Sequence, residues 1–314
     1  MIRRIGGIAA VTILLSLYAP LRAQDPIKPE LNLVPGTSFV CSMEMSKRVQ
    51  QTIAGEEQRM EQDLLLVWDY AILSKNDAGN YEISAKYSRI KSSQRFGMQT
   101  VEFDSDKMPD YLDPSLIGYK HLVGSEIGME ITPKGKVERL DGFQAIIDKV
   151  IDELNIPESP QRNEIISGLR NQFGDEAMRQ SFEQMTAFYP DNPVATGDSW
   201  HTDASTDVGF PVVFETDYTL LSRKDGIANI DVVSRVRSDP KSEGINMGMF
   251  TLTYDITGDQ KGLIKMNEAS GLPVKSDFLH TFSGTVAVSG APDLEEKSWP
   301  ISVEGQVLIT FERR

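Results

Sequence analysis

Two short motifs in the C-terminal part of the chain carry the side chains of a serine hydrolase. Gly197-Asp198-Ser199 places a serine after a glycine, and Asp277-Phe278-Leu279-His280 follows far downstream. In such an enzyme His280 takes the proton from Ser199 while Asp277 orients the imidazole. The chain therefore contains the groups for acyl transfer, provided that the fold brings them together.

These two blocks resemble the GDSL hydrolase pattern, and the resemblance implies Ser199, Asp277 and His280 as the catalytic set. That family places its serine after a hydrophobic strand in a parallel α/β domain, whereas Pro190-Asp191-Asn192-Pro193 precedes Ser199 here. A similar stretch recurs as Gly36-Thr37-Ser38-Phe39, where no histidine block follows. A repeated motif is better explained as a turn that leads into a strand. We therefore expect a non-enzymatic protein and keep the serine hydrolase as the alternative.

Metal ligands and cofactor motifs are sparse. His121, His201 and His280 are the only histidines, and none lies at metal-ligand spacing from another. Cys41 is the only cysteine, which excludes an intrachain disulfide and a cysteine-based zinc site. We expect no cofactor, and we expect Cys41 to be a buried small apolar residue because its surroundings are strand-like.

A weak calcium candidate lies in a proline-containing acidic segment. Calcium favours several carboxylates on a flexible loop. The EF-hand spacing is absent, so a solvated acidic loop is the preferred interpretation. The candidate ligands are Asp104, Asp106, Asp110 and Asp113.

Charge excludes one large class of partners. The chain of 314 residues has a formal net charge of -14 at pH 7. A nucleic-acid-binding protein needs a basic surface, so nucleic acid is not expected as a partner.

The N-terminus has the pattern of a signal peptide. Arg3 and Arg4 precede an apolar run, Pro20 breaks that run, and Ala23-Gln24 offers a small residue before a cleavage point. The run is shorter than the roughly 20 residues that a membrane-spanning helix needs. Residues 1–23 are therefore predicted to be removed, which leaves a periplasmic or secreted protein with no membrane span.

Two kinds of apolar periodicity divide the rest of the chain. Alternation typical of strands covers residues 24–140 and 190–314. Between them, residues 141–189 show the spacing of helices, with three amphipathic segments. The helix residues that we expect in the core are Ile147, Val150, Ile166 and Leu169.

An internal similarity links the two β-rich stretches. Asp69-Tyr70-Ala71-Ile72-Leu73-Ser74-Lys75 matches Asp217-Tyr218-Thr219-Leu220-Leu221-Ser222-Arg223, and in both cases an alternating strand follows a turn. Such self-similarity indicates a duplicated β-meander. The predicted fold is α+β: two similar antiparallel halves, with the helical segment between them, in one compact unit.

One further resemblance is carried by two stretches. Pro190-x-x-Pro193-Val194-x-x-Gly197-Asp198-Ser199-Trp200 follows the helices, and Ala269-Ser270-Gly271-Leu272-Pro273-Val274-Lys275-Ser276 comes later. Together they resemble an uncharacterised family of secreted bacterial β-rich proteins, a domain of unknown function. The resemblance implies an exported bacterial protein and brings no catalytic residues or ligand.

A curved sheet covered by helices can enclose an apolar ligand. We therefore expect an exported protein that binds a hydrophobic small molecule or an envelope protein. A purely structural envelope protein is the other alternative to the hydrolase.

Overall fold

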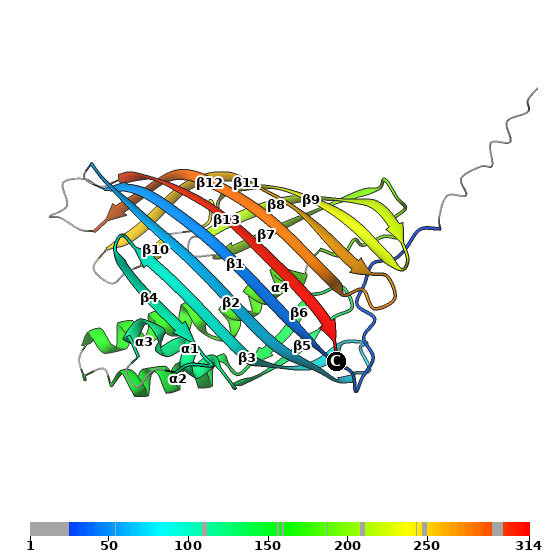
Figure 1. Ribbon diagram of the computed structural model, residues 1–314, viewed down its shortest axis with the longest axis horizontal. Coiled ribbons are helices and arrows are strands. Elements are labelled where there is room, and N and C mark those ends of the chain that lie inside the picture. Colours follow the sequence, from blue (N-terminus) through cyan, green and yellow to red (C-terminus); the bar gives the residue numbers. More distant parts are fainter. Residues whose placement is uncertain are drawn as a thin grey trace, which may run out of the picture.

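Long antiparallel strands make up most of the chain in the computed structural model (Figure 1). The structure describes residues 25–53, 55–108, 112–155, 157–158, 160–186, 188–207, 211–242, 244–246, 250–290 and 298–314, so the predicted signal peptide lies outside it. The strands are β1 (Ser38–Ile53), β2 (Glu56–Lys75), β3 (Tyr81–Phe96), β4 (Gln99–Asp104), β5 (Glu126–Ile131), β6 (Val137–Asp141), β7 (Ser199–Asp207), β8 (Pro211–Lys224), β9 (Ile227–Ser238), β10 (Ile245–Asn246), β11 (Thr251–Asn267), β12 (Pro273–Ser289) and β13 (Ser298–Arg313).

The helices lie mainly in the segment where the sequence predicts them. Their bounds are η1 (Pro114–Leu116), α1 (Ile117–Leu122), α2 (Phe143–Leu154), α3 (Pro160–Phe173) and α4 (Asp175–Thr186). Within the described residues, none of these helices has the length and apolar character needed to cross a membrane.

The strands form one continuous sheet. Its order is β6-β5-β3-β2-β1-β13-β12-β11-β9-β8-β7, with β4 beside β3 and β10 beside β11. The predicted mostly stranded, antiparallel character is confirmed. The predicted α+β fold with two meander halves is corrected to a mostly β fold with one large sheet, because β1 pairs with β13 and places Cys41 opposite Phe311.

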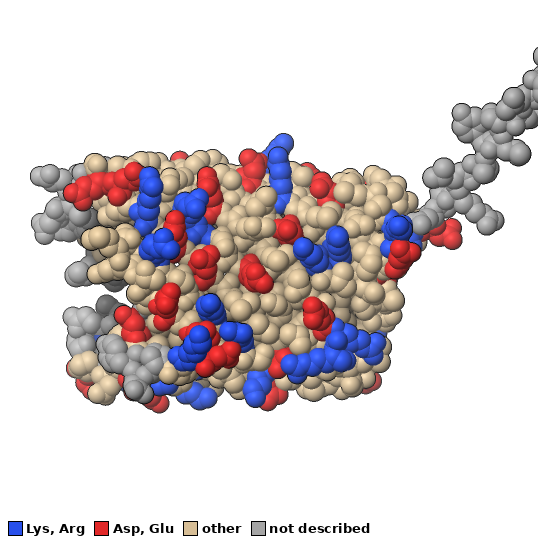
Figure 2. All heavy atoms as spheres, viewed as in Figure 1, with Lys and Arg blue, Asp and Glu red and all other residues tan. Residues whose placement is uncertain are grey.

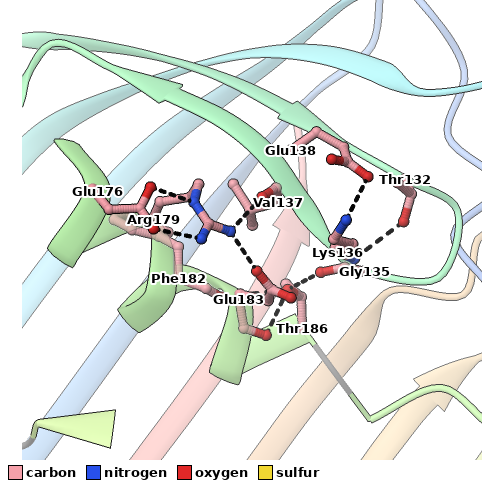
Figure 3. A network of polar contacts seen from close by, with 10 residues as sticks. All are labelled: Thr132, Gly135, Lys136, Val137, Glu138, Glu176, Arg179, Phe182, Glu183 and Thr186. Atoms are coloured by element: carbon pink, nitrogen blue, oxygen red, sulfur yellow. Dashed lines mark hydrogen bonds and ion pairs between the residues drawn. The ribbon is translucent and has the colours of Figure 1, made fainter. Parts of the chain in front are cut away.

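The sheet curls until both of its end strands reach the same helix (Figure 1). Helix α4 packs against β6 at one end and against β7 at the other. On the β6 side Arg179 Nη1 donates to Val137 O at 2.9 Å, and Thr186 Oγ1 donates to Gly135 O at 2.5 Å (Figure 3). Glu176 and Glu183 hold the same guanidinium. The helix therefore covers the edge of a strand that would otherwise expose unpaired backbone groups.

The two similar segments occupy equivalent positions in the sheet. In the first half Gly36 N donates to Ile72 O and Ile72 N donates to Thr37 O; in the second half Gly197 N donates to Leu220 O and Leu220 N to Asp198 O. Both glycines have positive φ, +82° and +96°, which suits a glycine at the turn before each strand.

Side chains repeat the same arrangement. Phe39 stacks on its cross-strand partner Tyr70 with ring centroids 5.0 Å apart, and Trp200 stacks on its partner Tyr218 at 5.5 Å. A register shift follows in each half, after Ile72 and after Leu220. Asp69-Tyr70 in β2 and Asp217-Tyr218 in β8 are therefore at matching strand positions.

The helix residues predicted to lie in the core are buried to different degrees. Ile147 is buried, as predicted, but Val150, Ile166 and Leu169 are only partly buried. Ile166 and Leu169 belong to α3, whose main contacts are with α2 and α4, and Val150 lies near the end of α2.

We expect the α2 face to contribute strongly to stability. Ile146 is 5 % exposed and belongs to the main apolar cluster, so Ile146→Ala should lower the free energy of unfolding by about 2–5 kcal/mol. Urea denaturation of this variant and of Lys149→Ala, an exposed position in the same helix, measures the difference. Equal stability of the two variants would show that this face is not in the core.

Candidate functional site

The concave face of the sheet is the inward face of the molecule. Along β1 the alternate residues Phe39 and Cys41 are buried, and Met43, Met45 and Lys47 follow on the same face. The intervening residues Glu44, Ser46 and Arg48 are exposed on the convex face. Figure 2 shows Lys and Arg mixed with Asp and Glu over that convex side.

A row of polar residues crosses the concave face at one level. Strand registers place these residues side by side from strand to strand. We call this row the polar belt; it consists of Gln94 (β3), Gln62 (β2), Lys47 (β1), Gly305 (β13), His280 (β12), Gln260 (β11), Ser234 (β9), Thr216 (β8) and Thr202 (β7).

Hydrogen bonds connect one end of the polar belt. Thr216 Oγ1 donates to Ser234 Oγ at 2.9 Å, and both side chains are buried. Gln260 Nε2 lies 3.5 Å from the same Ser234 oxygen. The belt is partly satisfied by its own members, as buried polar groups require.

Apolar rows flank the polar belt on both sides. We call the row toward the main core the core-side row: Leu64, Met45, Val307, Phe278, Gly262, Val232, Tyr218 and Trp200, with Ser92 at its β3 end. The opposite row consists of Phe96, Met60, Val49, Val303, Phe282, Gly258, Val236, Phe214 and Ala204. Polar groups therefore separate the main apolar cluster from a smaller one around Phe282 and Val303.

Lys47 is the one permanently charged residue in these three rows. Neither flanking row nor the polar belt contains an Asp or Glu. Burial lowers the pKa of the Lys47 ammonium, because transfer from water disfavours the charged form. No nearby carboxylate contributes to that shift.

His280 lies beside Lys47 because the residue between them is a glycine. A Cβ at Gly305 would be 2.3 Å from His280 Nε2, so the imidazole covers the place of a side chain. The ring stacks on Phe282 with centroids 5.0 Å apart. Burial, and then the charge of Lys47, lower the His280 pKa below its ordinary value.

The structure does not assemble the hydrolase residues. Ser199 is exposed on β7, and its Oγ lies 2.8 Å from Thr219 Oγ1. His280 faces inward from β12, and β8, β9 and β11 lie between the two strands. Asp277 accepts a hydrogen bond from Gln306 Nε2 at 2.9 Å on the convex face. Residues three apart on a strand face opposite ways, so Asp277 does not orient His280.

The other histidines belong to surface ion pairs. His201 lies between Asp217 and Asp203, at 2.8 and 2.9 Å. Hydrogen bonds from its ring, to Asp217 first and then Asp203, raise its pKa. His121 Nε2 is 2.7 Å from Glu153 and ties α1 to α2.

The acidic segment is partly neutralised by an arginine. Arg89 lies 3.1 Å from Asp106 and 3.8 Å from Asp104. Asp113 precedes η1, and Asp110 lies outside the described residues. In the part of the chain that the structure describes, no three potential ligands gather in a metal-binding group.

Cys41 is 4 % exposed, as expected of a small apolar residue. Burial raises the pKa of its thiol to about 12, which keeps it protonated and unreactive.

Two surface hollows of about 420 Å³ each lie away from Lys47 and His280. One lies beside β7 and is lined by residues that include Pro190, Ser199 and His201. The other lies on the convex side of β11, β12 and β13, around Lys261 and Leu279. The first is also lined by Trp200 and Thr202, the β7 members of the core-side row and the polar belt, and neither is lined by Lys47 or His280.

From the sequence, His280 was predicted as the base of the alternative serine hydrolase, and the polar belt was not predicted. The available signal was an inward polar residue in an otherwise apolar alternation, such as Lys47 after Met43 and Met45. What the sequence lacks is the register that aligns these residues across strands.

Fold and site together define a curled antiparallel sheet, closed by a helix, whose concave face carries a polar belt between apolar rows. The chain belongs to a family of unknown function, DUF6263, whose model matches residues 78–273.

No curated protein matches the chain. The outer membrane protein OprG from Pseudomonas aeruginosa is 6% identical, with a TM-score of 0.22 and coverage of 88% of this chain and 95% of that chain. The translocator domain of autotransporter NalP from Neisseria meningitidis is 6% identical, with a TM-score of 0.22 and coverage of 89% and 90%.

His201 and His280 lie in different environments, so their pKa values should be shifted in opposite directions. NMR of histidine-labelled protein should show His201 above, and His280 below, the ordinary pKa of about 6.5. A lowered folded pKa means that His280 costs stability as pH falls through this range, because the unfolded chain takes up the proton more readily. His201 adds stability at acid pH, which is lost as pH rises through its raised pKa. A raised His280 pKa would contradict its buried position beside Lys47. The variant His201→Asn serves to assign the signals.

Proposed function

We propose that this protein binds a hydrophobic or amphiphilic small molecule on the concave face of its sheet, without catalysing a reaction. The observation that carries the proposal is the polar belt between apolar rows. A wholly structural core gains nothing from a line of polar groups, because each one costs free energy when buried without a partner. A ligand with polar and apolar parts matches this pattern.

Incomplete burial supports the same proposal. Several apolar residues of the core-side row are only partly buried, although they face inward: Met45, Leu64, Phe278 and Val307. The fully buried core lies beyond them, around Trp68 and Tyr70. Apolar side chains that remain accessible on a concave face are typical of ligand-binding surfaces.

Binding should depend on the residues of β2 that face the concave side of the sheet and not on those that face the convex side. The neutral fluorescent probe N-phenylnaphthylamine should bind saturably, and Leu64→Gln should weaken binding by about tenfold, the equivalent of about 1.4 kcal/mol. Leu65→Gln is the matched control, because Leu65 lies on the convex face of the same strand, opposite Glu44 and Lys91. Fluorescence titration measures both variants.

Absence of saturable binding to the wild-type protein would contradict the proposal and favour a structural envelope protein or a partner of another envelope protein. Equal loss in both variants would place the site elsewhere.

We also propose that the protein is exported and acts in the periplasm or outside the cell. The basic start, apolar run and Ala23-Gln24 junction support this proposal. The charged convex face is suited to water (Figure 2).

N-terminal sequencing of protein from the native host should give Gln24 as the first residue. A mutant junction, Ala23→Arg, should retain the longer chain, because the cleavage position requires a small residue. Membrane-bound wild-type protein that still begins at Met1 would contradict cleavage.

We infer that the two halves arose by duplication of one β-meander. Support comes from the matched turns, the matched register shifts and the stacked pairs Phe39–Tyr70 and Trp200–Tyr218. Duplication explains why both halves contribute inward rows of the same kind.

A further inference from the structure

We propose that Lys47 and His280 form a head-group site for a single-chain amphiphile with a carboxylate head, whose tail lies along the core-side row. This inference rests on the proposed function, since it specifies what the concave face binds.

The charge balance of the concave face points to a monoanion. Lys47 is the single permanent charge of the polar belt and its flanking rows, and no Asp or Glu shares them. A partly buried ammonium without a carboxylate partner is unfavourable, and an anion bound beside it removes that penalty. One cation balances one negative charge, which fits a carboxylate better than a doubly charged phosphate.

The glycine between the two side chains gives the head group a second contact. Because Gly305 has no side chain, the His280 ring extends over β13 toward β1, where Lys47 is located. A neutral imidazole with its proton on Nε2 can donate a hydrogen bond from this edge. Lys47 and His280 can therefore contact the two oxygens of one carboxylate. Gln62 and Gln260 lie next along the polar belt and add amide donors at its sides.

The tail has an apolar path that begins beside this head-group site. Met45 precedes Lys47 by two residues and Phe278 precedes His280 by two, so both lie in the core-side row on the same face. Met43 continues the path toward the buried core. Methionine side chains adapt to the shape of a flexible chain. In the opposite row the neighbours of His280 and Gly305 are Phe282 and Val303, which are buried and leave little room for a tail at this point.

Three probes with the same tail and different heads test the head-group site. Dodecanoate, dodecanol and dodecyltrimethylammonium are titrated at neutral pH against the full-length mature protein, with displacement of N-phenylnaphthylamine as the readout. Dodecanoate should bind about tenfold more tightly than dodecanol, as expected for charge-assisted hydrogen bonds. Dodecyltrimethylammonium should bind more weakly than either.

Variants separate the charge from the fold. Lys47→Met should abolish the preference for dodecanoate while dodecanol binding remains, and Lys261→Met is the control, because it removes an exposed lysine from the convex face of β11. His280→Phe retains an aromatic ring beside Phe282 and removes the N–H donor, so it should reduce the preference in part. This second variant also tests the site if Lys47→Met does not fold.

Equal affinity of the wild-type protein for all three probes would overturn the head-group site and leave the proposed function intact. A preference for dodecanoate that survives in both Lys47→Met and His280→Phe would also overturn it. Failure of every probe to bind would contradict the proposed function itself.

Discussion

The pairing of β1 with β13 is the interaction on which the rest of the structure depends. It joins the strands of the N-terminal half to those of the C-terminal half, from Phe39 opposite Arg313 to Gln51 opposite Ile301. Without this seam each half would be a short meander with one open side. With it, the concave face becomes continuous, and Lys47 of the first half comes within reach of His280 of the second. A one-residue slip of the seam would turn every inward side chain of one strand to the convex face.

Glycines in the strands make room for large rings on the concave face, and helix α4 connects the two end strands of the sheet. Phe278 and Phe282 lie over Gly262 and Gly258 of the neighbouring strand, where a Cβ would come within 2.3 and 2.6 Å of their rings. The aromatic rings of β12 therefore fill the space beside the glycines of β11, and the two strands pack closely on the concave face. At the ends of the sheet, α4 lies between β6 and β7 instead of a direct strand pair. Trp200 Nε1 donates to Phe188 O at 2.8 Å just after that helix, so the β7 side is held as well.

Most of the strands and helices could be predicted from the sequence because their periodicity is local. Alternation in β3 and the helical spacing from Phe143 to Leu154 need no knowledge of the rest of the chain. The match between Asp69-Tyr70 and Asp217-Tyr218 also correctly indicated matching strand positions. The candidate site was harder. Residue types suggested Ser199, Asp277 and His280 as a set, but strand alternation turns Asp277 away from His280, and Ser199 lies on another strand. The polar belt could not be predicted, because it depends on registers between strands far apart in sequence, such as Lys47 with Gly305.

The position of the last strand has a consequence for how the molecule is made. Final closure of the sheet needs Ser298–Arg313, because this strand lies between β1 and β12. The N-terminal lead-in adds similar long-range contacts: Leu31 N donates to Pro133 O and Asn32 N donates to Ser270 O. Contacts of such high sequence separation slow folding, since most of the chain must be ordered before they form. A ribosome releases the chain from its N-terminus, so β1 is delivered well before β13, one of its two partners, and the sheet can close only after β13 has followed.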